Sequence, residues 1–455
     1  MDNGDKLVKS SKTKCPSCGD TKISLNTETG KLRCHSCRHE FESEKFEKIV
    51  DDVASLERVV VGQGAQNIAA DAQDVLTLKC DSCQAEVVVD TSEALQARCH
   101  WCRSVLSVNQ QILNGVVPDK VLPFSVTKEE AQAEIAKLVD KRSFFAHPKF
   151  KKEFTSENVM GVYLPYMVVD VNASTHFSGQ GETIFGVSNS ANLYDIERHF
   201  DLFIENLTIE SSAEMLHHQH YDYHSANNIV KAIKPFDTEN SVKWDANYLC
   251  GFTSLKRDTN IDDLVRPMEV KIKDVARSQI RSTLKIYDRR GVRWDVEEIN
   301  IKGTQWKTVY LPIWLYTCQI KGFVHYVAVN GRTLKTMGSV PINWTLFWLF
   351  TLIIIAITTV GIWLLMIGGG PMVISDENGG IGLVILALAF ALFSVGPIFY
   401  INILSKYRNQ GARFDHESEV NARIDNIRKQ DGFITTVYAS GSKISGRNDS
   451  KVDYK

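Results

Sequence analysis

The sequence predicts a multidomain protein in which two small β zinc ribbons and an α+β cytosolic domain precede an α-helical two-span transmembrane hairpin. Three observations predict this order: C-x-x-C pairs recur with regular spacing, two stretches of 24 residues carry no charge, and β-forming runs alternate with helix signals between them. The 455 residues are 44% hydrophobic and 23% charged, a globular average. A net charge of -2 argues against a protein built mainly to grip nucleic acid, which normally has a strongly basic face.

Eight of the ten cysteines form two sets with the same spacing. In each set two C-x-x-C pairs are separated by 15 residues, and the second set repeats the first at an offset of 65. Two such pairs converge on one tetrahedral zinc ion, and four thiolates leave no open position for water. The pattern therefore predicts two structural zinc ions, in ribbons spanning 11–41 and 75–110. The expected ligands are Cys15, Cys18, Cys34 and Cys37, then Cys80, Cys83, Cys99 and Cys102.

C-x-x-C pairs also occur in redox sites and in disulfides. A redox motif needs a βαβ context, whereas strand-like runs such as 86–89 flank these pairs, and no signal peptide precedes them. Both points favour zinc in a reducing compartment. His35, His39 and His100 are alternative ligands but are expected at the surface, because each site already has four cysteines.

Some residues near the ribbons are expected to pack rather than to bind. Trp101 is either a stacking platform or, as the pattern favours, part of the second ribbon's small core. Cys250 and Cys318 stand alone in apolar surroundings and are expected to be buried small side chains. Residues 42–74 are rich in charged residues, Ala and Gly and are predicted to form a partly helical linker, which makes the ribbons semi-independent.

The α+β domain is predicted over 115–342. A capping box at Thr127 predicts a helix to about residue 141, and acidic residues early and basic residues late predict another over 262–284. Strand-like runs at 161–170 and 309–316 share V-Y-L-P at an offset of 147, which indicates two related strand sets. Asn330-Gly331 is a strong hairpin signal.

The two charge-free stretches, 344–367 and 381–404, are each long enough to span a membrane, for which about 20 residues suffice. The connection between them has two acidic and no basic residues, whereas basic residues flank the pair on both sides. By the positive-inside rule we expect a multi-pass protein of the cell (plasma) membrane with both termini cytoplasmic and a cytosolic tail at 405–455. Without an ionisable residue inside either stretch, an anchor is favoured over a transporter.

One histidine group is a further candidate for chemistry. His217, His218, His220 and His224 surround Asp222, a cluster that would bind a metal on a helix but is more typical of a polar loop. The phosphate-binding, nucleophile-elbow and dinucleotide-binding motifs are absent from the sequence. Gly62-Gln63-Gly64 and Gly179-Gln180-Gly181 are expected to be turns.

Several runs together resemble a known family. The ribbons resemble transcription factor IIB-type zinc ribbons, and the chain from the second ribbon to the first span resembles bacterial zinc-ribbon membrane proteins that are often labelled primosomal-helicase-like. The runs that carry the resemblance are 121–124, 161–166, 235–237, 248–252, 311–314 and 330–333. This chain departs from the pattern in its first ribbon and at Leu334, where glycine is expected. The resemblance implies association with phage-shock protein A-like or SPFH/flotillin-like membrane-stress proteins.

These observations predict a non-enzymatic, membrane-anchored adaptor that recruits or scaffolds a cytosolic protein at the inner membrane face. The alternative is binding of nucleic acid or RNA polymerase by the ribbons. This alternative is supported by the composition of the first ribbon, which has six basic and three acidic residues. A third hypothesis is an enzyme that uses the histidine group.

Overall fold

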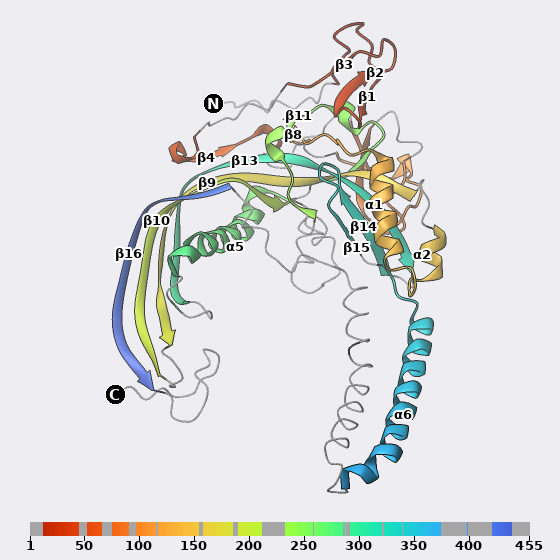
Figure 1. Cartoon of the computed structure of the whole chain (residues 1–455). Coiled ribbons are helices and arrows are strands. Elements are labelled where there is room, and N and C mark those ends of the chain that lie inside the picture. Colours follow the sequence, from red (N-terminus) through yellow and green to blue (C-terminus); the bar gives the residue numbers. More distant parts are fainter. Residues whose placement is uncertain are drawn as a thin grey trace.

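The computed structural model describes a sheet-rich body from which one long apolar helix extends (Figure 1). The residues that it describes are 12–44, 52–65, 75–90, 97–114, 117–153, 158–184, 190–211, 233–257, 259–284, 287, 292–320, 323–338, 340–374, 398 and 421–438. A small antiparallel sheet contains β1 (Ile23–Asn26), β2 (Lys31–Cys34) and β3 (Glu40–Phe41), and the other described strands form a second sheet of 13 strands.

Four long strands form the curved arm of the main sheet. They are β9 (Val159–Ile184), β10 (Ser190–Glu210), β13 (Arg293–Ile320) and β16 (Asn421–Tyr438), and neighbouring strands run antiparallel in the order β13-β9-β10-β16. Register shifts in all three pairings increase local twist and bend, which fits the curvature seen in Figure 1. The expected runs 161–170 and 309–316 are thus only parts of much longer strands, the first near the start of β9 and the second near the end of β13.

The repeated V-Y-L-P segments lie at the centre of the sheet and face each other. In the β9–β13 pairing Leu164 is opposite Leu311, Tyr163 is opposite Pro312, and Pro165 is opposite Tyr310. An antiparallel pair of this kind is related by a local twofold axis through the two leucines. The two strand sets that the repeat predicts are therefore neighbours, and their V-Y-L-P segments pair symmetrically where β9 meets β13.

Helix α5 (Ile261–Ile280) fills the inside of the curve (Figure 1). Its buried face repeats at helical spacing and packs against alternate residues of β9 and β10. The helix begins with a capping box from Asn260 and tolerates Pro267 near its start, and the turn η9 (Arg281–Leu284) continues it to the predicted end. Its buried residues are Leu264, Met268, Ile272, Val275, Ala276 and Ile280.

The other end of the body confirms the predicted hairpin and first helix. Helix α1 (Lys128–Asp140) begins at the Thr127 capping box and is followed by α2 (Pro148–Glu153). The strand β14 (Phe323–Asn330) pairs with both β13 and β15 (Thr336–Gly338). Leu334 has φ +61° in the intervening turn, the left-handed conformation for which glycine is usually chosen.

The sequence predicts a semi-independent second ribbon, and the structure corrects this expectation. Its strands β5 (Val75–Lys79), β6 (Glu86–Asp90) and β7 (Gln111–Ile112) belong to the main sheet, because β6 pairs with β12 (Thr253–Leu255) and β12 pairs with β9. The short strands β8 (Lys120–Val121) and β11 (Val242–Lys243) extend the same sheet beside β13. The first ribbon contacts η8 (Ala246–Leu249).

The expected helical tether is also corrected where the chain is described. Residues 52–65 contain η1 (Val53–Ser55), β4 (Val59–Val61) and η2 (Gln63–Ala65), and β4 pairs with β13 in parallel. Gly62 to Gly64 does form the expected turn, closed by the backbone nitrogen of Ala65 donating to the Gly62 carbonyl at 3.1 Å, and it is tightly packed, since a Cβ atom at Gly64 would clash with the backbone of Asp119. Gly179 to Gly181, also expected as a turn, lies inside β9. Burial of Val53, Leu56 and Ala65 explains why this segment packs instead of acting as a tether.

A group of buried charges joins that segment to the sheet. The Asp119 carboxylate accepts hydrogen bonds from the backbone nitrogens of Gly64 (2.6 Å) and Thr308 (2.8 Å), while Lys307 pairs with Asp170 at 2.8 Å. Burial, with the Lys307 ammonium acting in the same direction, lowers the pKa of Lys120 from 10.5 to about 8. These ionisable groups lie between β8, β9 and β13.

The lowered pKa of Lys120 predicts that stability rises with pH. Between about pH 8 and pH 10.5 the unfolded chain keeps the proton that the folded chain has lost, so unfolding takes up protons and the folded state gains up to about 3 kcal/mol. We expect Lys120→Met to remove this rise. Denaturant unfolding at pH 7.5 and pH 10.5 measures this rise, with the exposed Lys141→Met as control. An equal rise in the free energy of unfolding for wild type and Lys120→Met would contradict the prediction.

The apolar helix α6 (Trp344–Ile374) begins at the first predicted span. It is rooted in the body by Phe347, which is fully buried and has an edge contact with Phe145. Over Trp344–Trp363 it is long and apolar enough to cross a membrane, and only 6% of its most apolar window is buried. The second predicted span, 381–404, lies outside the described residues except for residue 398. The predicted tail contains β16, which returns to the sheet.

Candidate metal centres

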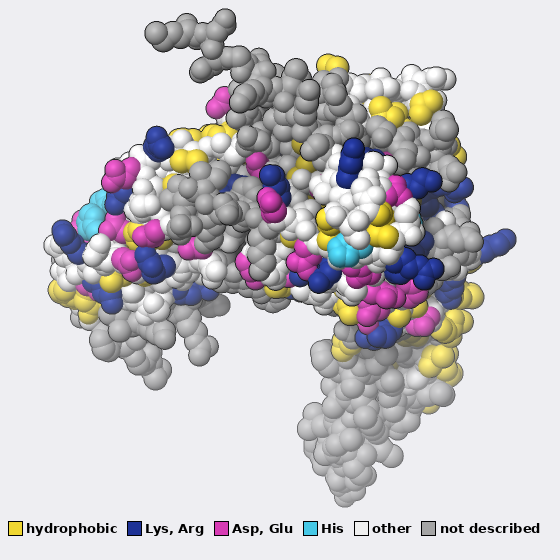
Figure 2. Space-filling view, turned by 90° about the horizontal axis from the view of Figure 1, so that it is seen from above, with side chains coloured by type: hydrophobic (Ala, Val, Ile, Leu, Met, Phe, Trp, Pro, Cys, Tyr) yellow, Lys and Arg dark blue, Asp and Glu magenta, His cyan; other side chains and the backbone are white. Residues whose placement is uncertain are grey.

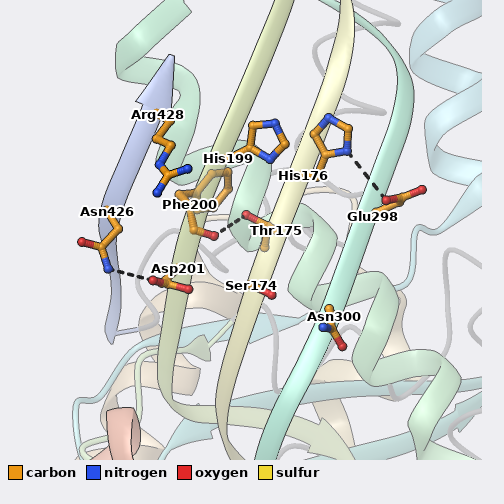
Figure 3. Close-up of a pocket in the computed structure, with 10 residues that line it drawn as sticks. All are labelled: Ser174, Thr175, His176, His199, Phe200, Asp201, Glu298, Asn300, Asn426 and Arg428. Carbon is orange, nitrogen blue, oxygen red and sulfur yellow. Dashed lines mark hydrogen bonds and ion pairs between the residues drawn. The ribbon is translucent and has the colours of Figure 1, made fainter. Parts of the chain in front are cut away.

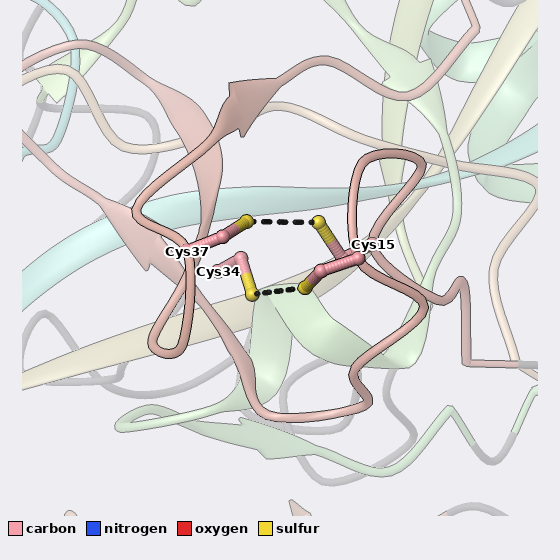
Figure 4. A group of neighbouring side chains, drawn as sticks. Cys15, Cys34 and Cys37 are labelled. Atoms are coloured by element: carbon pink, nitrogen blue, oxygen red, sulfur yellow. Dashed lines mark hydrogen bonds between the residues drawn. The ribbon is translucent and has the colours of Figure 1, made fainter.

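The structure brings the eight predicted ligands together as two groups of four, with all four sulfur atoms of each group within 4.8 Å of one another. In the first group Cys15 and Cys37 have their sulfur atoms 3.5 Å apart, and Cys18 and Cys34 3.6 Å apart (Figure 4). In the second, the Cys80–Cys102 and Cys83–Cys99 distances are both 3.5 Å.

These distances fit zinc and not disulfides. Four sulfur atoms about 2.3 Å from a central zinc ion have edges of about 3.8 Å, whereas a disulfide requires about 2.05 Å. All ten cysteines are free thiols in this structure. Both groups are therefore compatible with a bound zinc ion, held by four protein ligands that complete its coordination.

Each of the four C-x-x-C turns is built in the same way. The residue just after the second cysteine donates its backbone N–H to the carbonyl of the first, over 2.8–3.0 Å. That residue has positive φ in every turn, and only one of the four is glycine: Gly19, Arg38, Gln84 and Arg103. The backbone nitrogen of the first cysteine in turn donates to the residue five positions on. The repeated bonds fix the direction in which both sulfur atoms point.

The second group is partly buried at the main sheet. The hydrogen bond from the Cys99 thiol lowers the pKa of Cys83 to about 5. The same bond raises the pKa of Cys99. Thr317 of β13 donates its hydroxyl to the backbone carbonyl of His100 at 3.1 Å. This contact ties the knuckle that carries Cys99 directly to the core strand.

His100 is not a surface residue, which corrects our expectation. Its side chain is 1% exposed, and its Nδ1 lies 3.1 Å from the hydroxyl oxygen of Thr253. Burial lowers the pKa of His100 to about 3, so the ring is neutral at physiological pH. Its neighbour Trp101 packs against the apolar side chains of the ribbon and the sheet, as expected. Neither His35 nor His39 joins a cysteine group.

The first ribbon sits on the body through apolar and polar contacts. Leu25, Leu32 and Cys34 belong to the same buried cluster as Phe124 and Trp314. The backbone nitrogen of Thr13 donates to Asp245 at 2.9 Å, and the Asn247 amide donates to the Thr13 carbonyl. Lys12 reaches Asp90 of the second ribbon at 2.5 Å. The two metal groups are thus linked through one packed structure.

Much of the first ribbon's excess positive charge is locally paired. Lys12 pairs with Asp90, Lys31 with Glu42 at 3.3 Å and Arg33 with Glu40 at 3.9 Å. On the face shown in Figure 2, basic and acidic side chains are interspersed. Binding of nucleic acid or RNA polymerase by the ribbons stays an untested prediction.

Other candidate residues lie elsewhere. The group His217, His218, His220, Asp222 and His224 falls outside the described residues. Cys318 is buried as predicted, and Cys250 is half-buried. Among the residues that the structure describes, the two cysteine sets are the groups in which three or more ligand atoms already lie within 4.8 Å of one another.

Fold and sites together define, in the described part of the chain, a sheet-rich protein with two tetracysteine groups that could each hold a metal ion and one apolar helix of membrane-spanning length. The chain is similar to the uncharacterized protein YdjG of Bacillus subtilis, with 23% identity over 342 residues, which cover 72% of this chain and 90% of that protein. No family model matches the chain. No solved structure matches it either.

Proposed function

We propose that this protein is a membrane-anchored zinc-ribbon adaptor that holds a cytosolic protein at the inner face of the membrane. The observation that carries the proposal is the exposure of α6. Leu352 is 62% exposed and Ile357 66%, although the root of the helix at Phe347 is buried. A helix that is apolar on all sides needs an apolar environment beyond its own chain, and a bilayer supplies one.

The chain crosses the membrane twice in this proposal. β16 follows the apolar region and pairs with β10, which precedes it, so the two strands lie on the same side of any membrane. The number of crossings between residues 344 and 421 is then even. The charge-free stretch 381–404 is the second crossing.

The body and both termini face the cytosol. Lys406, Arg408 and Arg413 follow the second stretch, and the connection 368–380 has no basic residue. Tetracysteine sites also keep their thiolates best in a reducing compartment.

Partner binding is assigned to the body because its metal groups are closed and its arm has an open edge. Four thiolates per ion complete a tetrahedral site, so zinc shapes the surface without offering a reactive position. In the described part of the chain β16 pairs on one side, with β10, which leaves its other edge for strand addition by a partner. The family resemblance suggests an SPFH/flotillin-like or phage-shock protein A-like partner.

Crosslinking at two equally exposed positions tests the proposal. A photoreactive residue is placed at Phe433 on β16, which is 60% exposed, or as a control at Val270 on α5, which is 55% exposed. We expect one cytosolic protein to crosslink from position 433 and not from 270, and its membrane-bound fraction to fall when residues 344–404 are deleted. Equal crosslinking from both positions, or a membrane-bound fraction unchanged by the deletion, would contradict the proposal.

A further inference from the structure

A row of ionisable side chains crosses the face of the arm that lies opposite α5. Glu298 of β13 is directly across from His176 of β9, His176 is across from His199 of β10, and His199 is across from Arg428 of β16. Glu197 lies two residues before His199 on β10 and so shares its face. Strands β9, β10 and β13 thus bring together two imidazoles and two carboxylates, of which His176, His199 and Glu298 are drawn in Figure 3.

The two histidines are close and one of them is incompletely satisfied. Their ring centroids are 4.2 Å apart with the planes 2° from parallel. The Nδ1 of His176 lies 3.7 Å from Glu298, and its Nε2 lies 4.0 Å from Glu197. The Nε2 atom is shielded from solvent, yet it has no hydrogen-bond partner among the described residues. A buried imidazole nitrogen in this state lacks a partner that a cation would supply.

The surroundings favour a cation. The histidines line a hollow of about 520 Å³ that also includes Asp201 and Arg428. Asp201 already has partners, Lys302 at 2.8 Å and the Asn426 amide at 2.8 Å. Counting Glu197, Glu298 and Asp201 against Arg428 and Lys302, the carboxylates outnumber the basic groups by one.

We propose that His176, His199 and Glu197 form a third zinc site, distinct from both cysteine groups. Two imidazoles and one carboxylate are a donor set that Zn²⁺ accepts, with one coordination position left for water. The parallel rings do not yet point their nitrogens at one position, so binding requires the two imidazoles to turn out of their stack and the partly exposed Glu197 side chain to rotate toward the ion. Glu298 acts as a positioning residue, since a carboxylate that accepts from the second ring nitrogen of a ligating histidine orients it. An open position makes this ion exchangeable, unlike the ions in the cysteine groups.

Metal counting on the full chain in detergent tests the site. After equilibrium dialysis against micromolar free Zn²⁺, we expect three zinc ions per wild-type chain and two in the double variant His176→Gln/His199→Gln. His147→Gln, which removes a histidine elsewhere on the body, should keep three. Because the double variant changes a sheet face, retention of two zinc ions and of the wild-type circular dichroism spectrum shows that it is folded.

The carboxylates separate ligand from positioning residue. Glu298→Gln should keep the site and weaken its zinc affinity by about 10- to 100-fold. Glu197→Ala should remove it. Two ions in the wild-type chain, or three in the folded double histidine variant, would overturn the inference. Neither result bears on the adaptor proposal, which depends on α6 and β16.

Discussion

Replacing Cys99 by serine is expected to leave one tightly bound zinc ion in the cysteine groups and to destabilise the body strongly. Binding of structural zinc supplies apparent free energies of about 10–16 kcal/mol in isolated fingers, so a site that lacks one thiolate loses a large part of its support. The loss reaches the main sheet, because the same knuckle holds His100 against Thr253 and Thr317. Elemental analysis after dialysis against a weak chelator, together with thermal unfolding, measures both effects.

The half-buried Cys250 provides the matched control, since it belongs to neither cysteine group. We expect Cys250→Ser to keep both tightly bound ions and to unfold within a few degrees of wild type. An unchanged metal content in Cys99→Ser would show that the second group is not a four-thiolate zinc site. Iron in place of zinc would show the same for both groups.

Replacing Asp170 by asparagine should be the most damaging single change in the sheet itself. The Lys307–Asp170 pair bridges β13 and β9 with both side chains almost fully buried, at 3% and 6% exposure. Removing one charge leaves Lys307 buried without a counterion, at a cost of about 3–5 kcal/mol. The asparagine keeps an acceptor for the backbone nitrogen of Asn206, which donates to Asp170 at 2.8 Å. The loss thus reports the charge and not the hydrogen bond.

A double-mutant cycle identifies the cause. Adding Lys307→Met to Asp170→Asn removes the unpaired cation, so we expect the double variant to recover most of the lost free energy of unfolding. Glu134→Gln breaks the exposed pair with Lys137 and should cost at most about 1 kcal/mol. Additive losses from Asp170→Asn and Lys307→Met in urea unfolding would mean that the two side chains are not coupled.

The cysteine groups were predictable because chelation is a local property. A C-x-x-C turn places two thiolates on one ion by itself, and matching spacing identifies the second pair. The positive φ of Arg38, Gln84 and Arg103 was not predictable from residue type, because glycine marks only one of the four turns. The capping box of α1 and the span of α5 with η9 were likewise readable, since caps and helical periodicity involve neighbours in sequence.

No local sequence pattern indicates the burial of His100 or the meeting of His176 with His199. His100 is buried because β12 and β13 cover its ribbon, and both strands are distant in sequence. His176 and His199 meet through the register of β9 with β10, and a shift by one residue would put one of them on the opposite face. Glu197 of β10 and Glu298 of β13 lie within 4.0 Å of the His176 ring nitrogens for the same reason.

By itself the sequence determined the two metal groups, the central V-Y-L-P strands and the apolar helix that starts at Trp344, because each depends on spacing or composition within a short stretch. Only the tertiary structure decided that the second ribbon is part of the main sheet, that residues 52–65 pack against β13, and that β16 returns to β10 after the apolar region. Strand pairing is a contact between distant segments, and its partners are chosen by the burial and backbone hydrogen bonds of the whole sheet.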